Sequence, residues 1–250
     1  MQSAALYNPD LKKRLDNEVH VWFAEPDEIT DVDRLAYYQF ILAPDERARH
    51  ERFQFEKDRK HYLIAHALVR LALSSYVEIQ PSDWRFSANA QGRPEIETPD
   101  STRSLRFNLT HTNGLCACVV TLERDCGIDA EALSYRHNLK KIADRMFAVP
   151  ELKEIGELAE GGMGEPFFRH WTLREAYCKA LGVGLAGSTK DFYFKVVDEN
   201  QPQVVFTHGS SKADQWQFAL MRHTDSHLIA IAVHRPNQPD LKIVTQTLSA

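Results

Sequence analysis

Two acidic residues lie two positions apart in the segment Gly127–Glu131 (GIDAE). On a β-strand, side chains two residues apart point to the same face. Asp129 and Glu131 are therefore predicted to lie together, with Ile128 and Ala130 on the packed face. Neighbouring carboxylates repel each other unless a cation lies between them, and Mg²⁺ binds a few carboxylates together with water and phosphate oxygens. The segment is a candidate metal platform, although a solvated strand edge with two unpaired acids has the same pattern.

A third carboxylate and a cation occur in the predicted helix that contains Trp171–Lys179. Glu175 and Lys179 are four residues apart, so both lie on one face of that helix. One interpretation is a surface ion pair, which stabilises a helix by only a few tenths of a kcal/mol. The other is a metal-binding carboxylate and a phosphate-binding cation on one rigid element. The two residues alone do not separate these interpretations.

Polar side chains crowd a predicted strand end just before Asn113-Gly114, a dipeptide typical of a β-hairpin turn. They are Asn108, Thr110, His111 and Thr112. A histidine at such a junction is either a structural residue with its hydrogen bonds satisfied or a donor to a phosphate. The sequence contains no Walker A, dinucleotide-binding, GxSxG or HExxH motif and no Ser-His-Asp order. Several common chemistries therefore lack support.

Hydrophobic periodicity predicts the elements that position these residues. Helices are expected at 31–42, 45–77 and 167–181, and strands at 19–24, 105–109, 115–122, 127–133, 192–197, 203–206, 216–221 and 228–233. The three consecutive strands between 105 and 133 are joined by short turns, which predicts an antiparallel meander. Both halves of the chain run from a long helix to antiparallel strands. This order suggests an internal duplication, although the residue-level match between the halves is poor.

Composition limits the class of protein. The 250 residues are 43% hydrophobic and 26% charged, which is enough for one large domain or two small ones. A net charge of −5 argues against a nucleic-acid or membrane binder by bulk electrostatics, although basic residues cluster between Arg47 and Arg70. No apolar run could span a bilayer, and the first residues lack a secretory pattern. The four cysteines form no CxxC pair, so we expect reduced thiols in a cytoplasmic protein.

Three segments, in this order, resemble the motifs of the surfactin-synthetase-type 4′-phosphopantetheinyl transferases. They are FNLTHT at 107–112, GIDAE at 127–131 and WTLREAYCKALGVGL at 171–185. Similarity extends upstream through the basic segment 43–70 and the turn FSANAQGRP at 86–94, and covers roughly residues 20–195. Three motifs in family order are far more specific than any one of them.

The resemblance implies an enzyme that transfers the phosphopantetheine arm of coenzyme A to a serine of an apo acyl or peptidyl carrier protein. The second product would be adenosine 3′,5′-bisphosphate. The implied fold is a pseudo-dimer of two similar α+β halves, each a long helix on a small antiparallel sheet, with the active site in the cleft between them. The expected halves are 1–126, which binds the adenosine and 3′-phosphate of coenzyme A, and 127–250, which holds magnesium and contacts the carrier. A duplicated chain should supply a complete site as a monomer.

The resemblance also implies roles for individual residues. Asp129, Glu131 and Glu175 would be the magnesium ligands. Glu175 would in addition accept the proton of the carrier serine, either directly or through a metal-bound water, and Lys179 would bind the pyrophosphate. The coenzyme A contacts implied elsewhere are Arg47, Arg49, His61, Arg93, Thr110 and His111.

The chain departs from the family pattern at several positions. Arg174 replaces the usual lysine before Glu175, which keeps the charge but changes the donor geometry. Glu46 stands where some relatives carry lysine, and His61 where many carry arginine. Ala130 replaces a branched residue. The contacts to the 3′-phosphate are therefore the least determined part of the resemblance.

The carrier protein would need a local docking surface, since carrier domains are acidic and this chain has no net positive charge. The segment 136–152 is the candidate. It offers Lys140, Lys141 and Arg145 beside Leu139, Met146 and Phe147. A solvated basic face over an ordinary helix core has the same composition. The sequence does not identify the carrier or its pathway.

Two other functions share part of this pattern. A magnesium-dependent nuclease or phosphodiesterase would use the same three carboxylates with a water nucleophile. A coenzyme A-binding module that lost catalysis would keep the ligand site and transfer nothing. We expect neither a nucleic acid nor a membrane as partner.

Overall fold

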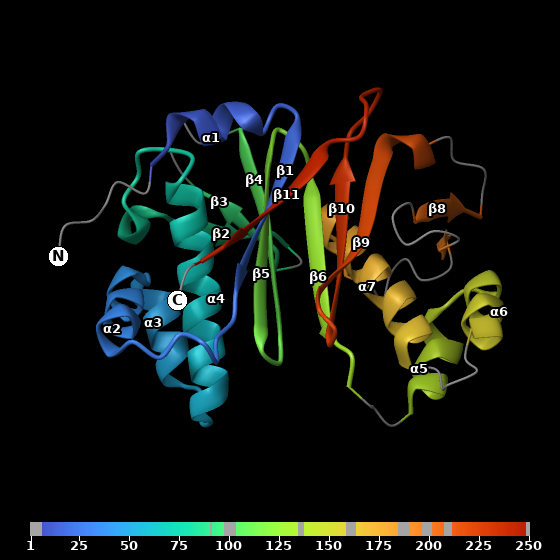
Figure 1. The fold of residues 1–250 in the computed structure, drawn as a ribbon, viewed down its shortest axis with the longest axis horizontal. Helices are drawn as coiled ribbons and strands as arrows, with labels where there is room; N and C mark the ends of the chain where they lie inside the picture. The colour runs from blue at the N-terminus through green and yellow to red at the C-terminus, as the bar shows by residue number, and fades with distance from the viewer. Residues whose placement is uncertain are drawn as a thin grey trace. The chain divides into compact units, whose positions relative to one another are not determined.

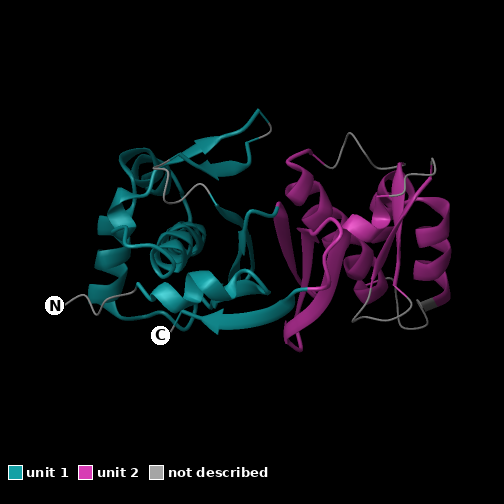
Figure 2. Cartoon of the chain, turned by 90° about the horizontal axis from the view of Figure 1, so that it is seen from above, with its two compact units in different colours: residues 1–124, 241–250 teal, residues 125–240 magenta. Residues whose placement is uncertain are grey.

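A computed structural model describes residues 7–90, 92–97, 104–134, 138–158, 164–184, 191–196, 202–207 and 212–248. The chain divides into two compact units, one of residues 1–124 with 241–250 and the other of residues 125–240 (Figures 1 and 2). Each unit packs a long helix on a small sheet, which confirms the predicted α+β fold of two halves. No described helix combines the length and the apolar content needed to cross a bilayer.

The first unit is built around a mixed four-stranded sheet and the long helix α4. Its elements are α1 (Pro9–Arg14), β1 (Glu18–Ala24), α2 (Val32–Ile41), α3 (Pro44–Glu51), α4 (Glu56–Ser74), η1 (Pro81–Asp83), β2 (Phe86–Ala88), β3 (Pro94–Ile96), β4 (Leu105–Thr112), β5 (Leu115–Leu122) and β11 (Lys242–Thr247). The strand order is β11-β1-β5-β4. An apolar stripe on α4 is buried against this sheet, because apolar residues at helical spacing form one continuous face; it consists of Leu63, Ala67, Leu68 and Leu71.

The second unit packs α7 on a three-stranded antiparallel sheet. Its elements are β6 (Cys126–Ala132), α5 (Leu139–Met146), α6 (Val149–Leu158), α7 (Gly164–Leu181), β7 (Phe192–Lys195), β8 (Gln203–Phe206), η5 (Ala213–Gln215), β9 (Trp216–Thr224) and β10 (His227–His234). The strand order is β6-β10-β9, and β7 pairs with β8 separately. Gly182 has a φ of 68°, which few residues other than glycine adopt, and follows the last residue of α7, as a glycine at a helix C-terminus commonly does.

Two predictions about the elements were wrong. The meander between 105 and 133 is interrupted, because β5 pairs with β1 and β4 whereas β6 pairs with β10 in the other unit. The predicted helix 45–77 is two helices, α3 and α4. The apolar stripe begins only near Tyr62, so the strongly polar segment before it has no packed face that would keep it on the same axis.

The two units differ from the predicted halves 1–126 and 127–250 in the unit to which the C-terminal residues belong. Residues 241–250 belong to the first unit, since β11 pairs in parallel with β1 from Glu18↔Lys242 to Phe23↔Thr247. The pairing of β1 with a parallel strand from the distant end of the chain is a long-range contact that no local sequence pattern predicts.

Candidate functional site

The acidic pair lies on β6 as the strand period predicted. Ile128 and Ala130 are buried, Asp129 is 7% exposed and Glu131 is half-buried. β6 is an edge strand that pairs only with β10 among the described strands of its sheet. Residues 127, 129 and 131 share the face that α7 covers, because a Cβ built on Gly127 would meet the α7 backbone. The two carboxylates therefore face a helix and not open solvent.

Gly127 permits an unusually close approach of α7 to β6. A Cβ at this position would lie 2.0 Å from the carbonyl oxygen of Ala176 and 2.5 Å from the amide nitrogen of Ala180. Both atoms belong to the helix backbone, so no side-chain movement could relieve the contact. The glycine of the GIDAE segment thus sets the distance between the strand with Asp129 and the helix with Glu175.

Lys179 crosses from α7 to the acidic strand. Its Nζ donates to Asp129 Oδ1 at 2.7 Å and to the carbonyl oxygen of Ile128 at 3.1 Å. Asp129 is mostly buried and the lysine side chain is 29% exposed, so this ion pair is shielded from solvent far more than an ordinary surface pair. The structure brings Lys179 and Asp129 into direct contact from two elements 50 residues apart in the chain.

Glu175 interacts electrostatically with the same pair. Burial raises the pKa of Glu175, the carboxylates of Asp129 and Glu131 raise it further, and the ammonium of Lys179 lowers it in part. Glu131 shares a strand face with Asp129, and Glu175 shares a helix face with Lys179. The contact between Lys179 and Asp129 therefore brings the three carboxylates into one neighbourhood. A cation among them would favour their charged forms.

This donor set suits a hard divalent cation, since it consists of carboxylate oxygens on a rigid strand and helix. Within the described part of the chain, however, no three His, Cys, Asp or Glu side chains are arranged closely enough to form a metal site. The chemistry of the donors fits magnesium.

Some of the predicted coenzyme A contacts lie in the first unit around a cavity of about 610 Å³. Its lining includes Arg49 and His111, together with Gly92 and Pro94, the residues on either side of Arg93. The turn that holds these residues is closed by Asn89, whose Oδ1 accepts from the Arg93 amide at 2.9 Å. The cavity thus joins three segments that the sequence had marked separately.

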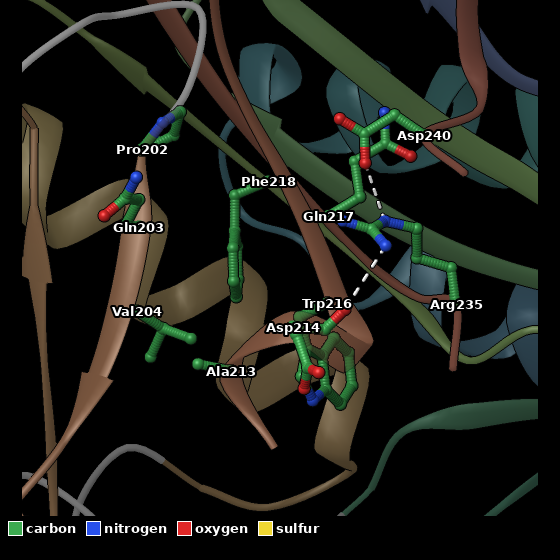
Figure 3. A pocket seen from close by; sticks show the side chains of 10 residues that line it. All are labelled: Pro202, Gln203, Val204, Ala213, Asp214, Trp216, Gln217, Phe218, Arg235 and Asp240. Atoms are coloured by element: carbon green, nitrogen blue, oxygen red, sulfur yellow. Dashed lines mark hydrogen bonds and ion pairs between the residues drawn. The ribbon is translucent and has the colours of Figure 1, made fainter. Parts of the chain in front are cut away.

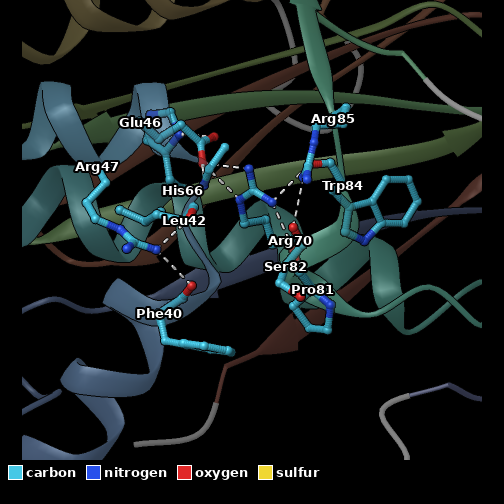
Figure 4. A network of polar contacts seen from close by, with 11 residues as sticks. Phe40, Leu42, Glu46, Arg47, His66, Arg70, Pro81, Ser82, Trp84 and Arg85 are labelled. Atoms are coloured by element: carbon cyan, nitrogen blue, oxygen red, sulfur yellow. Dashed lines mark hydrogen bonds and ion pairs between the residues drawn. The ribbon is translucent and has the colours of Figure 1, made fainter.

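The other predicted contacts are not among the described residues that line this cavity. Arg47 donates to the carbonyl oxygens of Phe40 and Leu42 at 3.2 and 3.3 Å, and so holds the end of α2 (Figure 4). Thr110 is buried on β4 and points away from the neighbouring His111, which is exposed. Burial of His61 lowers its pKa, so this side chain is neutral near pH 7.

Glu46 lines the cavity, but its charge is balanced within the protein. The carboxylate accepts from Arg70 Nη2 at 2.6 Å, from His66 Nδ1 at 2.9 Å and from the amide of Ala43 at 2.9 Å (Figure 4). Burial acts to raise the pKa of Glu46, but the bonds from His66 and Arg70 outweigh it and leave the pKa lowered. The carboxylate of Glu46 is therefore part of an internal network.

The sequence patterns did not predict the aromatic side chains that line one side of the cavity. Tyr62 and His66 lie four apart on α4, and their rings are in contact, with centroids 4.0 Å apart and planes tilted by 33°. The guanidinium carbon of Arg49 lies 5.8 Å from the centre of the Tyr62 ring. The spacing of four on a predicted helix is the sequence signal that could have found this pair.

A second cavity, of about 340 Å³, lies in the other unit between β8, η5 and β9 (Figure 3). Trp216 and Phe218 form its apolar side, and Arg235 pairs with Asp240 at 2.7 Å on its polar side. None of the predicted catalytic or binding residues is part of its described lining.

The predicted carrier surface lies partly on α5. Residues 135–137, which include Arg136, are outside the described residues. Lys140, Lys141 and Arg145 are exposed, as predicted, but Leu139 and Phe147 are buried in the core. The apolar side chains that reach the surface in this segment are Ile142, 38% exposed, and Val149, 79% exposed.

Comparisons with known proteins match both units. A family model described as the 4′-phosphopantetheinyl transferase superfamily matches residues 125–232. A second, described as 4′-phosphopantetheinyl transferase, N-terminal, matches residues 31–122. The two models together cover the units that carry the acidic residues and the larger cavity.

Several characterised or named relatives align over most of the chain. The 4′-phosphopantetheinyl transferase HetI of Nostoc sp. is 32% identical over 186 residues, which are 74% of this chain and 78% of the relative. A putative 4′-phosphopantetheinyl transferase of Synechocystis sp. is 27% identical over 76% of each chain. The 4′-phosphopantetheinyl transferase Sfp of Bacillus subtilis is 25% identical over 67% of this chain and 72% of its own. On this evidence the chain belongs to the 4′-phosphopantetheinyl transferase family of enzymes.

Proposed function

We propose that this enzyme transfers the 4′-phosphopantetheine arm of coenzyme A to a serine of an apo acyl or peptidyl carrier protein and releases adenosine 3′,5′-bisphosphate. The observation that carries the proposal is the grouping of Asp129, Glu131, Glu175 and Lys179 on the facing surfaces of β6 and α7. Membership of the family supports it. We also infer the surfactin-synthetase type, on the strength of the three motifs at 107–112, 127–131 and 171–185.

In the proposed reaction the serine hydroxyl oxygen attacks the β-phosphorus of coenzyme A. A new phosphorus–oxygen bond forms, the bond to the adenosine-bearing phosphate breaks, and that phosphate leaves with the electron pair. The leaving group is already a good one, so stabilising charge matters more than making a powerful nucleophile. A magnesium ion held by Asp129, Glu131 and Glu175 would offset the charge that builds on the pyrophosphate.

Lys179 and Glu175 have separate roles in this proposal. Lys179 is anchored through Asp129 and the carbonyl of Ile128, so its ammonium is already placed for a pyrophosphate and loses little freedom when it binds one. Glu175 accepts the serine proton. Burial and the two neighbouring carboxylates raise the pKa of Glu175 in the metal-free protein, and a bound cation would favour its ionised form, which is the form that accepts a proton.

The larger cavity of the first unit is the proposed site of the adenosine end of coenzyme A. Arg49 would supply positive charge for a phosphate and His111 a hydrogen-bond donor, and the Tyr62 and His66 rings would supply aromatic contact for the base. Arg93, which follows the cavity residue Gly92, is proposed to reach the pyrophosphate. Arg47, His61 and Thr110 stay predictions as contacts, since Arg47 is bonded to the end of α2 and the side chains of the other two are buried.

We propose the exposed face of α5 as the carrier contact. Lys140, Lys141 and Arg145 would attract an acidic carrier, and Ile142 and Val149 would supply apolar contact beside them. A monomeric state and a cytoplasmic location also stay predictions.

The direct test is to incubate the protein with coenzyme A, magnesium and a panel of apo carriers of the fatty-acid, polyketide, peptide-synthetase and lysine-pathway classes. We expect at least one carrier to gain the mass of one phosphopantetheine arm, only when magnesium is present. Cleavage of DNA or RNA instead would indicate a nuclease. Coenzyme A binding without modification of any carrier would indicate a silent binding module.

Two variants test the assigned roles. Glu175→Gln should abolish transfer and leave coenzyme A binding measurable, because the amide keeps the shape but cannot accept a proton. Asp129→Ala should lower activity and shift its dependence on magnesium. Near-normal turnover by Glu175→Gln would remove Glu175 from the mechanism, and an unchanged magnesium response of Asp129→Ala would remove Asp129 from the metal platform.

A further inference from the structure

Four charged side chains form a largely buried cluster, and one of them directly precedes Glu175 in the chain. Glu151 and Glu154 come from α6, and His170 and Arg174 from α7; we call them the α6–α7 charge cluster. The side chains of Glu151 and Arg174 are fully buried and that of His170 is 1% exposed. Removal of charges from water costs several kcal/mol per ion unless each is paired and hydrogen-bonded. A cluster of this kind is therefore sensitive to the loss of any member.

Glu151 is the centre of the cluster. Its Oε1 accepts from Arg174 Nε at 2.9 Å and from the amide of Phe194 at 3.0 Å. Its Oε2 accepts from Arg174 Nη2 at 2.5 Å and from the amide of Ala148 at 2.9 Å. One carboxylate thus ties together the beginning of α6, the middle of α7 and the strand β7.

Arg174 has its guanidinium held on a second side. Nη2 also donates to the carbonyl oxygen of Phe192 at 2.9 Å, and the guanidinium carbon lies 4.8 Å from the centre of the Phe192 ring. The planar group makes several bonds in fixed directions, whereas a lysine ammonium could not reach the same acceptors in the same geometry. This explains what the arginine at this position does in this protein.

These bonds determine the rotation of α7 about its axis. Successive residues of an α-helix are about 100° apart around the axis. With Arg174 bonded into the core, Glu175 must project toward the next face, and Lys179 lies one turn further along the same face. That is the face on which Lys179 meets Asp129.

We propose that Glu151 is a positioning residue for the transfer reaction, acting through Arg174 to fix the rotation of α7 and hence the places of Glu175 and Lys179. This inference rests on the proposed function. Glu151 itself touches neither of the reacting groups in the scheme above, so its effect must pass through the helix.

His170 completes the cluster beside its two carboxylates. It lies one turn before Arg174, with Nδ1 3.7 Å from Glu151 Oε1 and Nε2 3.5 Å from Glu154 Oε1. Burial acts to lower the pKa of His170, but Glu151 and Glu154 outweigh it and raise the pKa. Two carboxylates and one guanidinium leave one negative charge, which a protonated imidazole would balance. The uncharged ring of Phe147 also lies against His170.

The kinetic test compares two identical chemical changes on α6. Glu151→Gln removes the central charge, and Glu157→Gln removes an exposed charge that pairs only loosely, at 3.7 Å, with Lys153. At a temperature where both variants are folded, we expect Glu151→Gln to lower kcat about tenfold or more with the KM for coenzyme A within about twofold, and Glu157→Gln to change neither. A folded Glu151→Gln with wild-type kcat would overturn the proposal.

Arg174→Lys is the conservative variant for the same test, and it serves also if Glu151→Gln does not fold. It keeps the charge opposite Glu151 but gives up simultaneous bonds to Glu151 and the Phe192 carbonyl. We expect a smaller fall in kcat than for Glu151→Gln, again with little change in KM. Wild-type kcat in a folded Arg174→Lys protein would count against a positioning role for the guanidinium.

The charge state of His170 can be measured without any transferase assay, by nitrogen NMR of the labelled imidazole in the wild-type protein. We expect the imidazole to deprotonate at a lower pH in Glu151→Gln than in the wild type, because the variant loses one of the two carboxylates beside the ring. The same titration in both proteins would overturn the place of Glu151 at the centre of the cluster. If wild-type protein modified no carrier, the proposed function would fail, while this measurement would still decide whether Glu151 acts on His170.

Discussion

The close approach of α7 to β6 yields a sharp prediction for Gly127→Ala. The added Cβ would lie 2.0 Å from the carbonyl oxygen of Ala176, about 1.4 Å closer than an ordinary contact of 3.4 Å. Because both nearby atoms belong to the helix backbone, relief requires α7 to move away from the strand. Overpacking of this kind costs about 1–3 kcal/mol, and sometimes more. A shift of about 1 Å at a catalytic group can lower a rate about a hundredfold.

The assay measures the unfolding midpoint and, well below that midpoint, the rate of carrier modification. We expect Gly127→Ala to lower the midpoint by several degrees, since about 1 kcal/mol corresponds to about 2–4 °C in a protein of this size. The rate should fall by more than the folded fraction explains, because the contact between Lys179 and Asp129 depends on the same helix–strand distance.

Gly156→Ala is the matched control. Gly156 lies in α6, its φ is not positive, and a Cβ there meets nothing within 4 Å. The same substitution at this position should leave activity unchanged and raise stability by about 0.4–1 kcal/mol. The reasoning is refuted if Gly127→Ala matches the control in both midpoint and rate.

Three further predictions concern charge and connectivity. Lys179→Met should lower the transfer rate and weaken pyrophosphate binding, because the cation bonded to Asp129 is lost; unchanged inhibition by free pyrophosphate would contradict this. Since the folded-state pKa of His170 is raised, its stabilising contribution should be complete below about pH 6.5 and fall as pH rises through the folded-state pKa. Denaturant midpoints across that range should therefore drop with pH, and the drop should shrink in His170→Gln. Truncation after Asp240 removes β11 and the buried Leu241 and should lower the midpoint; an unchanged midpoint would show that this strand adds no stability.

Much of the local structure could be predicted. The Asn113-Gly114 dipeptide predicted the hairpin, in which Thr112 pairs with Leu115 and Gly114 has a φ of 83°, a value that glycine adopts readily. The strands at 115–122 and 203–206 have the predicted bounds. These features depend on backbone preferences and short-range periodicity, which are properties of a few consecutive residues.

Sheet membership could not be predicted in the same way. β5 and β6 are separated by only three residues, yet they belong to different sheets. A short connection favours a hairpin, but the free energy of each strand depends on the partner surface that it buries. That surface comes from β1 for one strand and from β10 for the other, both distant in sequence.

The sequence by itself determined which groups can do chemistry: the alternation that places Asp129 and Glu131 on one strand face, and the spacing that places Glu175 and Lys179 on one helix face. Only the tertiary structure decided that Lys179 reaches Asp129 and that Arg174 is bonded to Glu151. The period of a strand or helix fixes the direction of a side chain, because it is set by backbone geometry. Which group the side chain then contacts depends on long-range packing. Here Gly127 has no Cβ, and this lets the helix pack closely against the strand.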